Sequence, residues 1–266
     1  MNVIEGIILG LIQGLTEFLP VSSSGHLALF HDIFGLEEAT QAFDIFLHMA
    51  TLIAVFIYYW KDIWPLIKNP FQRTTALLVA GTIPTVIAAL LFNDALGEIF
   101  VGAKNLGFNF LFTGLVLLYA DTRRTGKKKI RNMSIFDALV VGTMQGIAIA
   151  PAISRSGMTI SGCLSRNMDR KNAAKFSFLL SIPAILGAMV LTLKDIITGE
   201  VALGETFGVL PIVCGCITAA ISGYLAIRFM VKIIENKKLK WFAFYVFALG
   251  LFLIGDQFIF HLIIPA

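Results

Sequence analysis

The sequence predicts an all-α polytopic membrane protein with six transmembrane helices plus two re-entrant helical hairpins, arranged as an inverted-topology repeat of two halves. Three observations predict this fold class. The chain of 266 residues is 57% hydrophobic and only 14% charged, it contains six long apolar runs, and a segment near its start returns near its middle. The mean hydropathy of +0.83 excludes a soluble globular domain and a disordered chain.

Cysteine and charge content narrow the class further. Cys163, Cys214 and Cys216 lie among apolar or small residues, and their number and spacing fit neither a disulfide framework nor a zinc site. We interpret them as buried filler. The first residues show no basic region and no small-residue cleavage motif, so we expect no removable signal peptide. The pI near 9.0 reflects basic loops and requires no nucleic-acid partner.

The amino-acid sequence contains an internal repeat. The segment GLIQGLTEFLPVSSSG, from Gly10, returns from Gly142 as GTMQGIAIAPAISRSG, at an offset of 132 residues. The identical pairs are Gly10/Gly142, Gln13/Gln145, Gly14/Gly146, Ser22/Ser154, Ser24/Ser156 and Gly25/Gly157. The motif at residues 61–63 also recurs at 194–196. We therefore expect two repeats, 1–133 and 134–266, that together form one membrane domain.

The elements follow from the lengths of the apolar runs, because a membrane span needs about 20 mostly apolar residues. Six runs reach that length, at 41–60, 73–93, 104–121, 172–194, 207–231 and 241–262. Shorter apolar segments remain at 2–18 and 24–35 in the first half and at 135–150 and 156–167 in the second. Each is too short to cross comfortably, so each pair predicts a re-entrant hairpin.

The orientation follows from span number and loop charge. Three spans per half is an odd number, so the second half must be inserted upside down relative to the first. One predicted side carries Lys61, Lys68, Arg73, Arg123, Arg124, Lys127, Lys128, Lys129, Arg131, Arg166, Arg170, Lys171, Lys232, Lys237, Lys238 and Lys240, and the other has little beyond Lys104 and Lys194. The positive-inside rule places the basic side in the cytoplasm and both termini outside the cell membrane. The two hairpin tips should then meet near mid-membrane.

The tip of the first hairpin brings together a carboxylate, hydroxyl groups and an imidazole. Gln13 and Glu17 are four residues apart on a helix and share one face. Pro20 breaks that helix, and the polar residues Ser22, Ser23, Ser24 and His26 follow. Irregular backbone at membrane depth is tolerated only inside protein or beside a wet cavity. The tip therefore predicts a polar cavity.

The tip of the second hairpin, residues 151–159, reads PAISRSGMT. Serines before a helix start supply N-caps, the free amides at that start bind anions, and an arginine adds donors suited to phosphate oxygens. An arginine in the membrane interior is costly and marks a functional site. This tip predicts a phosphate cradle.

The tip residues also have structural interpretations. The serine run could simply cap a helix, and Gln13 could hydrogen-bond between helices. Glu17 and Arg155 could form a structural ion pair across the two halves, and His26 could be a satisfied core histidine. The combination of these groups favours a functional site over each separate alternative.

Other polar residues lack such a combination. We interpret His31, His48 and His261 as structural because no comparable group of polar residues accompanies them in the sequence. Asp121 and the basic run after it indicate a solvated cytoplasmic loop, with contact to anionic lipid as the alternative.

At these residues the chain resembles the undecaprenyl-diphosphate phosphatase family of the bacitracin-resistance type. The family's first motif is matched at Gln13, Glu17, Pro20, Ser22, Ser23 and His26, and its second at Pro151, Ser154, Arg155, Ser156 and Thr159. The resemblance covers essentially the whole chain. In two places the chain departs from the family pattern. Gln13 stands where many members have a glutamate, which argues against a two-carboxylate metal site, and Ala152 replaces a glycine, so its backbone should avoid glycine-only φ/ψ space.

The resemblance implies removal of the terminal phosphate from a polyprenyl diphosphate, which recycles the lipid carrier for envelope glycan synthesis and confers bacitracin resistance. It implies substrate-binding roles for Gln13, Ser22, Ser24, Ser154, Ser156 and Thr159. It also implies the partners, which are the lipid substrate and membrane lipids, and leaves a homodimer open.

The resemblance assigns the chemistry to four residues. Arg155 would stabilise charge on the transferring phosphoryl group. Glu17, with Gln13, would hold a divalent cation, Mg²⁺ or Ca²⁺, or Glu17 would position a water. His26 would serve as general base or acid, and Ser23 as the nucleophile or as a phosphate ligand. Whether Ser23 or His26 attacks is left open.

Two other functions fit the architecture. A transporter or lipid-carrier flippase would use the inverted repeat for alternating access, and an anion channel would face two serine-lined helix starts toward a pore. The chemical asymmetry of the tips favours a reaction, because Glu17 and His26 occur only in the first copy and Arg155 only in the second.

Overall fold

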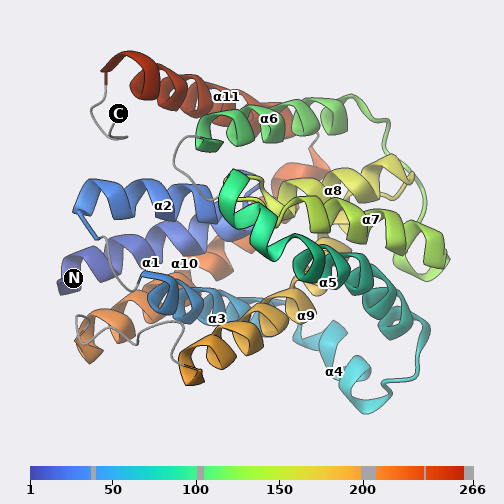
Figure 1. Cartoon of the computed structure of the whole chain (residues 1–266). Helices are drawn as coiled ribbons and strands as arrows, with labels where there is room; N and C mark the ends of the chain where they lie inside the picture. The colour runs from blue at the N-terminus through green and yellow to red at the C-terminus, as the bar shows by residue number, and fades with distance from the viewer. Residues whose placement is uncertain (37–39, 101–104, 199–207, 237, 261–266) are drawn as a thin grey trace.

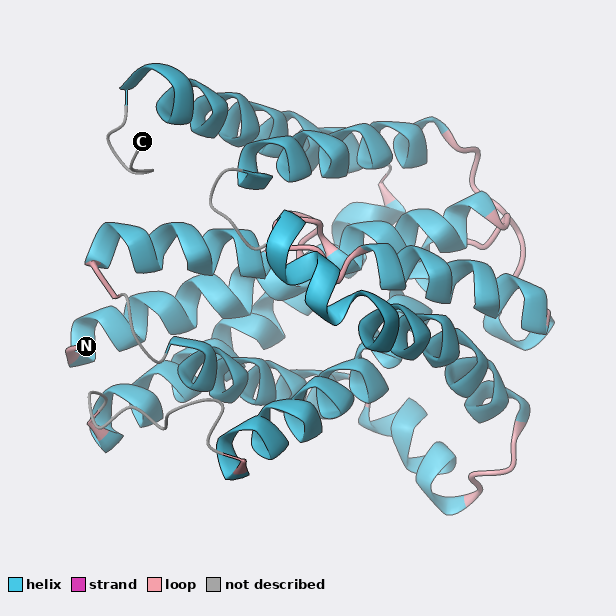
Figure 2. Ribbon diagram, viewed as in Figure 1, coloured by secondary structure: helices cyan, strands magenta, loops and turns pink. Residues whose placement is uncertain are grey.

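The computed structural model describes residues 1–36, 40–100, 105–198, 208–236 and 238–260, and within these ranges every extended element is a helix (Figure 2). The helices are α1 Val3–Phe18, α2 Ser23–Phe34, α3 Thr40–Tyr58, α4 Trp60–Lys68, α5 Arg73–Phe100, α6 Leu106–Thr122, α7 Ile135–Ile147, α8 Arg155–Ser165, α9 Arg170–Ile197, α10 Val209–Glu235 and α11 Leu239–Gly255. The prediction of an all-α chain is therefore confirmed for these residues.

The segments predicted to form the two hairpins fold as short helix pairs, α1 with α2 and α7 with α8. Their first helices begin in the same way. Asn2 and Glu5 form a capping box at the start of α1, and Ser134 and Asp137 form one at the start of α7. The two boxes are 132 residues apart, the offset of the sequence repeat. The sequence repeat therefore includes the capping hydrogen bonds at the starts of α1 and α7.

Four described helices, α5, α9, α10 and α11, are long and apolar enough to cross a membrane, and the bent pair of α3 and α4 would make a fifth. The remaining predicted span, 104–121, corresponds to α6, which is a shorter apolar helix of 17 residues. These helices identify the chain as a multi-pass membrane protein.

The first predicted span, 41–60, corresponds to α3 within two residues, but the sequence did not predict the bend that follows it. Helix α3 ends at Tyr58, and α4 leaves it at an angle of 90°. Charge explains the turn, because Lys61 and Asp62 follow directly, and Asp62 forms an ion pair with Lys175 of α9 at 2.6 Å. A helix that continued straight would carry these charges into hydrocarbon.

Glycines let each hairpin pack tightly against the other half of the chain. Helix α1 lies along α10, and α7 lies along α5. A Cβ on Gly10 would overlap the carbonyl oxygen of Gly215, and one on Gly142 would overlap that of Gly81. The repeated glycines therefore serve close backbone approach, as small residues do in membrane helix pairs.

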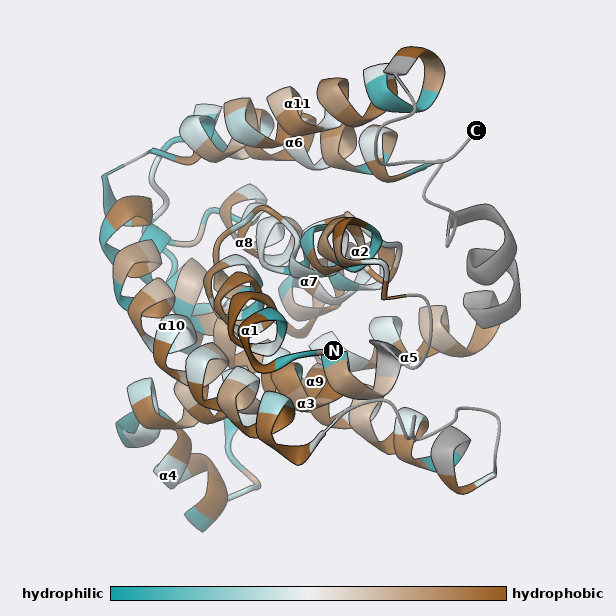
Figure 3. Cartoon of the chain, turned by 90° about the vertical axis from the view of Figure 1, so that its left-hand side faces the viewer, coloured by the Kyte–Doolittle hydropathy of each residue, from teal (hydrophilic) through white to brown (hydrophobic). Residues whose placement is uncertain are grey.

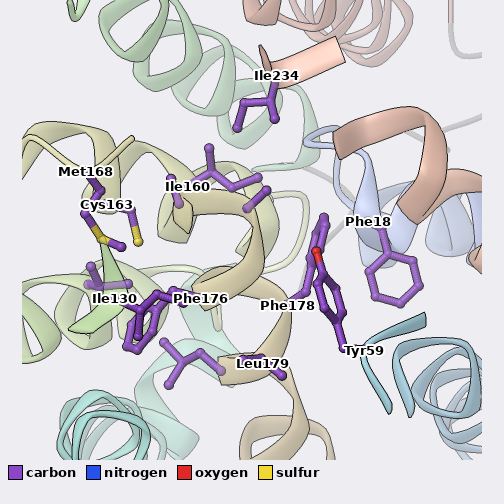
Figure 4. Packing of buried hydrophobic residues seen from close by; sticks show 14 of the residues in the cluster. Phe18, Tyr59, Ile130, Ile160, Cys163, Met168, Phe176, Phe178, Leu179 and Ile234 are labelled. Atoms are coloured by element: carbon purple, nitrogen blue, oxygen red, sulfur yellow. The ribbon is translucent and has the colours of Figure 1, made fainter. Parts of the chain in front are cut away.

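Hydrophobic residues occur along most of the helices (Figure 3), and their side chains lie both inside the bundle and on its outer surface. Inside, the largest core cluster includes the aromatic residues Phe18, Tyr59 and Phe178, which lie close together in Figure 4. Helices α6 and α11 pack together along one edge of the molecule (Figures 1 and 3). In Figure 1, α1 begins and α11 ends at the same end of the molecule, and the basic loop between α6 and α7 lies at the opposite end.

Candidate active site

The two hairpin tips are in direct contact, as the sequence predicts. Ser156, in the first turn of α8, donates a hydrogen bond to the carbonyl of Leu19, which ends α1, at 3.0 Å. A Cβ on Gly25 would lie 2.8 Å from the Cβ of Ala152. The starts of α2 and α8 thus converge in the interior of the bundle, and both present the positive end of a helix.

The backbone at Ala152 differs from the expectation. Its φ is +62°, in the left-handed region that favours glycine, so the prediction that it would avoid this region is wrong. Neighbouring groups hold it there. Asn109 donates to the Pro151 carbonyl at 2.8 Å, and Thr113 donates to the Ala152 carbonyl at 3.2 Å. Two side chains of α6 thereby hold this turn in place.

The predicted binding hydroxyls form matching caps in the two tips. Ser22 caps α2 by accepting from the Gly25 amide, and Ser154 caps α8 by accepting from the Gly157 amide. In each tip the capping hydroxyl also contacts the second serine of the motif, Ser24 at 3.2 Å and Ser156 at 3.3 Å. Thr159 is buried and its hydroxyl contacts Ser177 of α9 at 2.6 Å. The structural role expected for the serines is therefore real, and of these hydroxyls only that of Ser24 belongs to an exposed residue.

Glu17 is the centre of the site. Its Oε1 accepts from Arg155 Nη2 at 2.5 Å, so the ion pair considered above as the structural alternative is present between α1 and α8. Its Oε2 accepts from Ser23 Oγ at 2.5 Å and from Gln13 Nε2 at 3.1 Å. His48 Nε2 lies 3.6 Å from the same oxygen. Groups from α1, α2, α3 and α8 therefore converge on one buried carboxylate.

Two buried polar atoms of this cluster have no hydrogen-bond partner among the described residues. They are Arg155 Nη1, a donor, and Gln13 Oε1, an acceptor. Buried polar groups are nearly always satisfied in folded proteins, and exceptions are frequent at binding and catalytic sites. One free guanidinium donor beside two helix starts matches the phosphate cradle predicted from the second tip.

His26 is buried in the first turn of α2, and both of its ring nitrogens have partners. Nδ1 lies 2.6 Å from the carbonyl oxygen of Ser22, and Nε2 lies 2.8 Å from the hydroxyl of Tyr245. Neither nitrogen contacts Ser23, whose hydroxyl points instead to Glu17. The structure therefore places Glu17, rather than His26, beside the candidate nucleophile.

Sequence reasoning missed two residues near this site, His48 and Tyr245. The interpretation of His48 as an isolated structural histidine is wrong, because it lies beside Glu17. His31 lies 3.3 Å from Asp44, away from this cluster. The available signal was the spacing of Asp44 and His48, four residues apart in an otherwise apolar helix. Tyr245 had no such signal, since it lies in an apolar run far from either motif. His261 lies outside the described residues.

A resident divalent cation is not supported by the side chains alone. Glu17 is the only carboxylate in the cluster, and both of its oxygens already accept hydrogen bonds, one of them from a guanidinium. Among the residues described, no three His, Cys, Asp or Glu side chains form a group that could hold a metal ion. Hard cations such as Mg²⁺ need several oxygen ligands. Further oxygens would have to come from a ligand.

The chain is similar to known proteins over nearly its whole length. A family model described as "Bacitracin resistance protein BacA" matches residues 6–252. The chain is 48% identical over 250 residues to the undecaprenyl-diphosphatase of Carboxydothermus hydrogenoformans, a match that covers 94% of this chain and 95% of that protein. It is 46% identical over 258 residues to undecaprenyl-diphosphatase 4 of Bacillus thuringiensis subsp. konkukian, covering 97% and 98% of the two chains. It is 42% identical over 256 residues to the undecaprenyl-diphosphatase of Halothermothrix orenii, covering 96% and 98%. With matched residues that extend from the first hairpin into α11, the chain belongs to the bacitracin resistance protein BacA family.

Proposed function

We propose that this protein is an integral-membrane phosphatase that hydrolyses an undecaprenyl-type polyprenyl diphosphate to the monophosphate and inorganic phosphate. Its role is to recycle the lipid carrier of cell-envelope glycan synthesis, which also confers bacitracin resistance. The observation that carries the proposal is the contact of the Ser23 hydroxyl with Glu17 at 2.5 Å, while Arg155 from the other hairpin holds the same carboxylate. A nucleophile, a base and a phosphate-binding cation are thereby adjacent.

In the first step, Ser23 Oγ bonds to the terminal phosphorus while its proton passes to Glu17 Oε2. The bond from that phosphorus to the bridging oxygen breaks, and the electron pair leaves with the polyprenyl monophosphate. In the second step, the oxygen of water bonds to the phosphorus of the phosphoserine. The bond to Oγ breaks, Glu17 returns its proton to Oγ, and dihydrogen phosphate leaves.

In this mechanism Arg155 can exchange its partner, from the Glu17 carboxylate to the phosphoryl group, as the reaction proceeds. While Glu17 is ionised, Arg155 Nη2 is held by its carboxylate, and Nη1 is free for phosphate. When the carboxyl takes the serine proton, it no longer attracts the guanidinium, which can then bind the phosphoryl group with both nitrogens. An interaction that strengthens only as the reaction proceeds lowers the barrier rather than merely binding substrate.

The divalent cation, Mg²⁺ or Ca²⁺, is part of the proposal as a companion of the substrate. Phosphate oxygens would supply most of its ligands, and Glu17 and Gln13 Oε1 would be the protein groups that hold it. When bound, it would neutralise phosphate charge, and neither step above passes through it.

For topology, we propose six spans and two re-entrant hairpins in the cell membrane, with repeats 1–133 and 134–266 inserted in opposite directions and both termini extracytoplasmic. The paired capping boxes, the paired serine caps and the exchange of hairpins between the halves support this. Thiol labelling of single cysteines introduced at Arg124 and at Ala266, in cysteine-free protein in intact cells, tests it. Labelling of both positions from the same side would refute the arrangement. A homodimer remains open within this proposal.

The activity is tested with purified protein in nanodiscs by phosphate release from undecaprenyl diphosphate and from farnesyl diphosphate. Ser23→Ala should lose about a thousandfold or more of the rate, because it lacks the nucleophile. Ser165→Ala is the matched control, since its hydroxyl only contacts the Gly162 carbonyl of its own helix. Release by Ser23→Ala at the control rate would exclude the serine. Absence of release from the wild-type protein, combined with transfer of labelled carrier between leaflets, would favour the flippase.

A further inference from the structure

We propose that Tyr245 is a positioning residue for the reaction, acting through His26 to hold the turn that aims Ser23 at Glu17. This inference rests on the proposed phosphatase activity and adds a residue outside both sequence motifs. Tyr245 belongs to α11, which is not part of either hairpin, and its side chain is half-exposed on the outside of the bundle. Its hydroxyl nevertheless reaches Nε2 of the buried His26.

The two partners of His26 fix which nitrogen carries the hydrogen. The Ser22 carbonyl can only accept, so Nδ1, at 2.6 Å, must be the donor. In a neutral imidazole the other nitrogen is then an acceptor, and the Tyr245 hydroxyl donates to Nε2 at 2.8 Å. The order of donation therefore runs from Tyr245 to His26 and from His26 to Ser22.

The ring of His26 is also held in place by packing. The planes of His26 and Tyr245 are within 11° of each other, and Phe110 of α6 meets the imidazole edge-on at 85°, with ring centroids 5.5 Å apart. Helices α6 and α11 pack together as a pair. This pair therefore holds the imidazole by one ring contact from each helix and by one hydrogen bond from Tyr245.

We call the contacts of His26 with Tyr245 and with the Ser22 carbonyl the clamp. The strained turn at Ser22 explains why the clamp is needed. Ser22 has φ +69° and ψ 103°, a conformation that a residue with a side chain rarely adopts. Its carbonyl accepts both the His26 amide, at 3.3 Å, and the imidazole. Ser23 is the next residue, so the orientation of the Ser22 peptide sets the direction of the Ser23 hydroxyl. With both nitrogens engaged in this clamp, His26 acts through geometry rather than as a proton carrier.

Conservative variants of His26 separate the two roles. The side-chain amide of His26→Asn can donate to the Ser22 carbonyl from nearly the position of Nδ1, but it cannot carry a proton at neutral pH. The longer His26→Gln places its amide nearer the position of Nε2, and His26→Ala has no donor. A positioning role predicts that His26→Asn keeps at least tenfold more activity than the Gln and Ala variants and retains the wild-type pH profile. Equal loss in all three variants would overturn the proposal.

The tyrosine is tested by removing only its hydroxyl. Tyr245→Phe should lower kcat by about tenfold and leave KM within about twofold of wild type, because substrate contacts are intact and only the aim of Ser23 is relaxed. Tyr119→Phe is the matched control, since Tyr119 is a half-exposed tyrosine on α6 with its ring beside Arg123. A wild-type kcat for Tyr245→Phe would exclude the positioning role.

A spectroscopic measurement tests the hydrogen-bond order without any turnover. In ¹⁵N-histidine-labelled protein, the His26 signals, assigned by their loss in His26→Asn, should show a protonated Nδ1 and an unprotonated Nε2. In Tyr245→Phe the same signals should move toward a mixture of tautomers. Because this result does not depend on phosphate release, failure of the clamp and failure of the proposed activity are distinguishable. A protonated Nε2 in the wild type would contradict the clamp.

Discussion

Arg155 and Glu17 lie 138 positions apart in the chain and form an ion pair of 2.5 Å where the two hairpin tips meet. Each comes from a repeat whose counterpart has a different residue, since Ser23 stands opposite Arg155 and Ile149 opposite Glu17 at the repeat offset. The duplicated scaffold thus supplies two similar helix starts, and divergence between the copies supplies the charges. This distribution is the structural basis for assigning a reaction to the site.

Breaking this pair should separate stability from activity. Glu17→Gln leaves Arg155 buried without its charge partner, and loss of one member of a buried pair costs about 3 to 5 kcal/mol. The double variant Glu17→Gln/Arg155→Gln should recover much of that loss, because neither charge remains, yet neither protein should release phosphate at more than about one hundredth of the wild-type rate. Unfolding in detergent and phosphate release measure the two effects.

A matched double-mutant cycle on the exposed pair Lys171 and Glu235, which lies at 4.0 Å, is the control. That pair should show a coupling of no more than about 1 kcal/mol. Equal coupling energies in the two cycles would show that the ion pair of Glu17 and Arg155 is no stronger than an exposed ion pair.

The short helix pairs and the contact between their tips could be predicted because their signals are local. Segments too short to span, a helix-breaking Pro20 and serines before a helix start all act within a few residues. The sequence offered contact of Glu17 with Arg155 only as an alternative to separate functional roles, and the structure shows that contact. The left-handed backbone of Ala152 could not be predicted in this way, because side chains of α6 stabilise it from a distant part of the chain.

Residues inside apolar helices were the weak point of the sequence-based prediction. Tyr245 and His48 both lie on long apolar helices, and the sequence does not specify which neighbour each one faces. Their roles depend on how α11 and α3 pack against α2 and α1, which is a tertiary property. The bend after Tyr58 was missed for a related reason, since hydropathy averages over a window and smooths the charge step at Lys61.

The glycine contacts predict a sharp positional difference in stability. Gly142→Ala should destabilise the protein by about 1 to 3 kcal/mol, because its Cβ would overlap the Gly81 carbonyl and force α7 away from α5. Gly187→Ala, within α9, has no atom within 4 Å of its added Cβ and should be neutral or stabilising by up to about 1 kcal/mol. Thermal unfolding of the two variants makes the comparison, and equal shifts would show that close packing of α7 is not limiting.

Asp137 predicts an acid-sensitive anchor at the start of the second hairpin. Burial by itself would raise the pKa of this carboxyl, but hydrogen bonds from Lys128, from the Ser134 backbone and from Arg166 outweigh it and hold the pKa well below its usual range. The ionised form is therefore favoured by folding. Its stabilisation is fully present above the unfolded-state pKa of about 4 and is lost as pH falls toward the lower folded value.

The variant Asp137→Asn isolates this contribution. It should be less stable than wild type at pH 7, and the difference should shrink as the pH falls below about 4, because the wild-type carboxyl is then increasingly protonated. Asp62→Asn is the comparison, since its pair with Lys175 is more exposed and should contribute little at any pH. Unfolding midpoints measured from pH 3 to pH 7 provide the test. A difference that stays constant over this range would contradict the ion-pair explanation.

Removal of divalent cations tests how much of the charge neutralisation the protein itself supplies. Glu17 is engaged with Arg155 and Ser23, and a cation must therefore depend mainly on phosphate oxygens for its ligands. We expect excess chelator to lower phosphate release by more than tenfold, but to leave the unfolding midpoint of the substrate-free protein unchanged, because no ion is needed to hold the hairpins together. Restoring Mg²⁺ or Ca²⁺ in separate samples then ranks the two ions.

A variant of Gln13 tests the same dependence from the protein side. Gln13→Glu should lower the cation concentration needed for activity, since it places a second carboxylate beside Glu17. Gln145→Glu is the control at the repeat-related position near Thr85. Full activity in chelator would remove the cation from the mechanism and leave Arg155 with the two helix starts as the only positive groups acting on the phosphate.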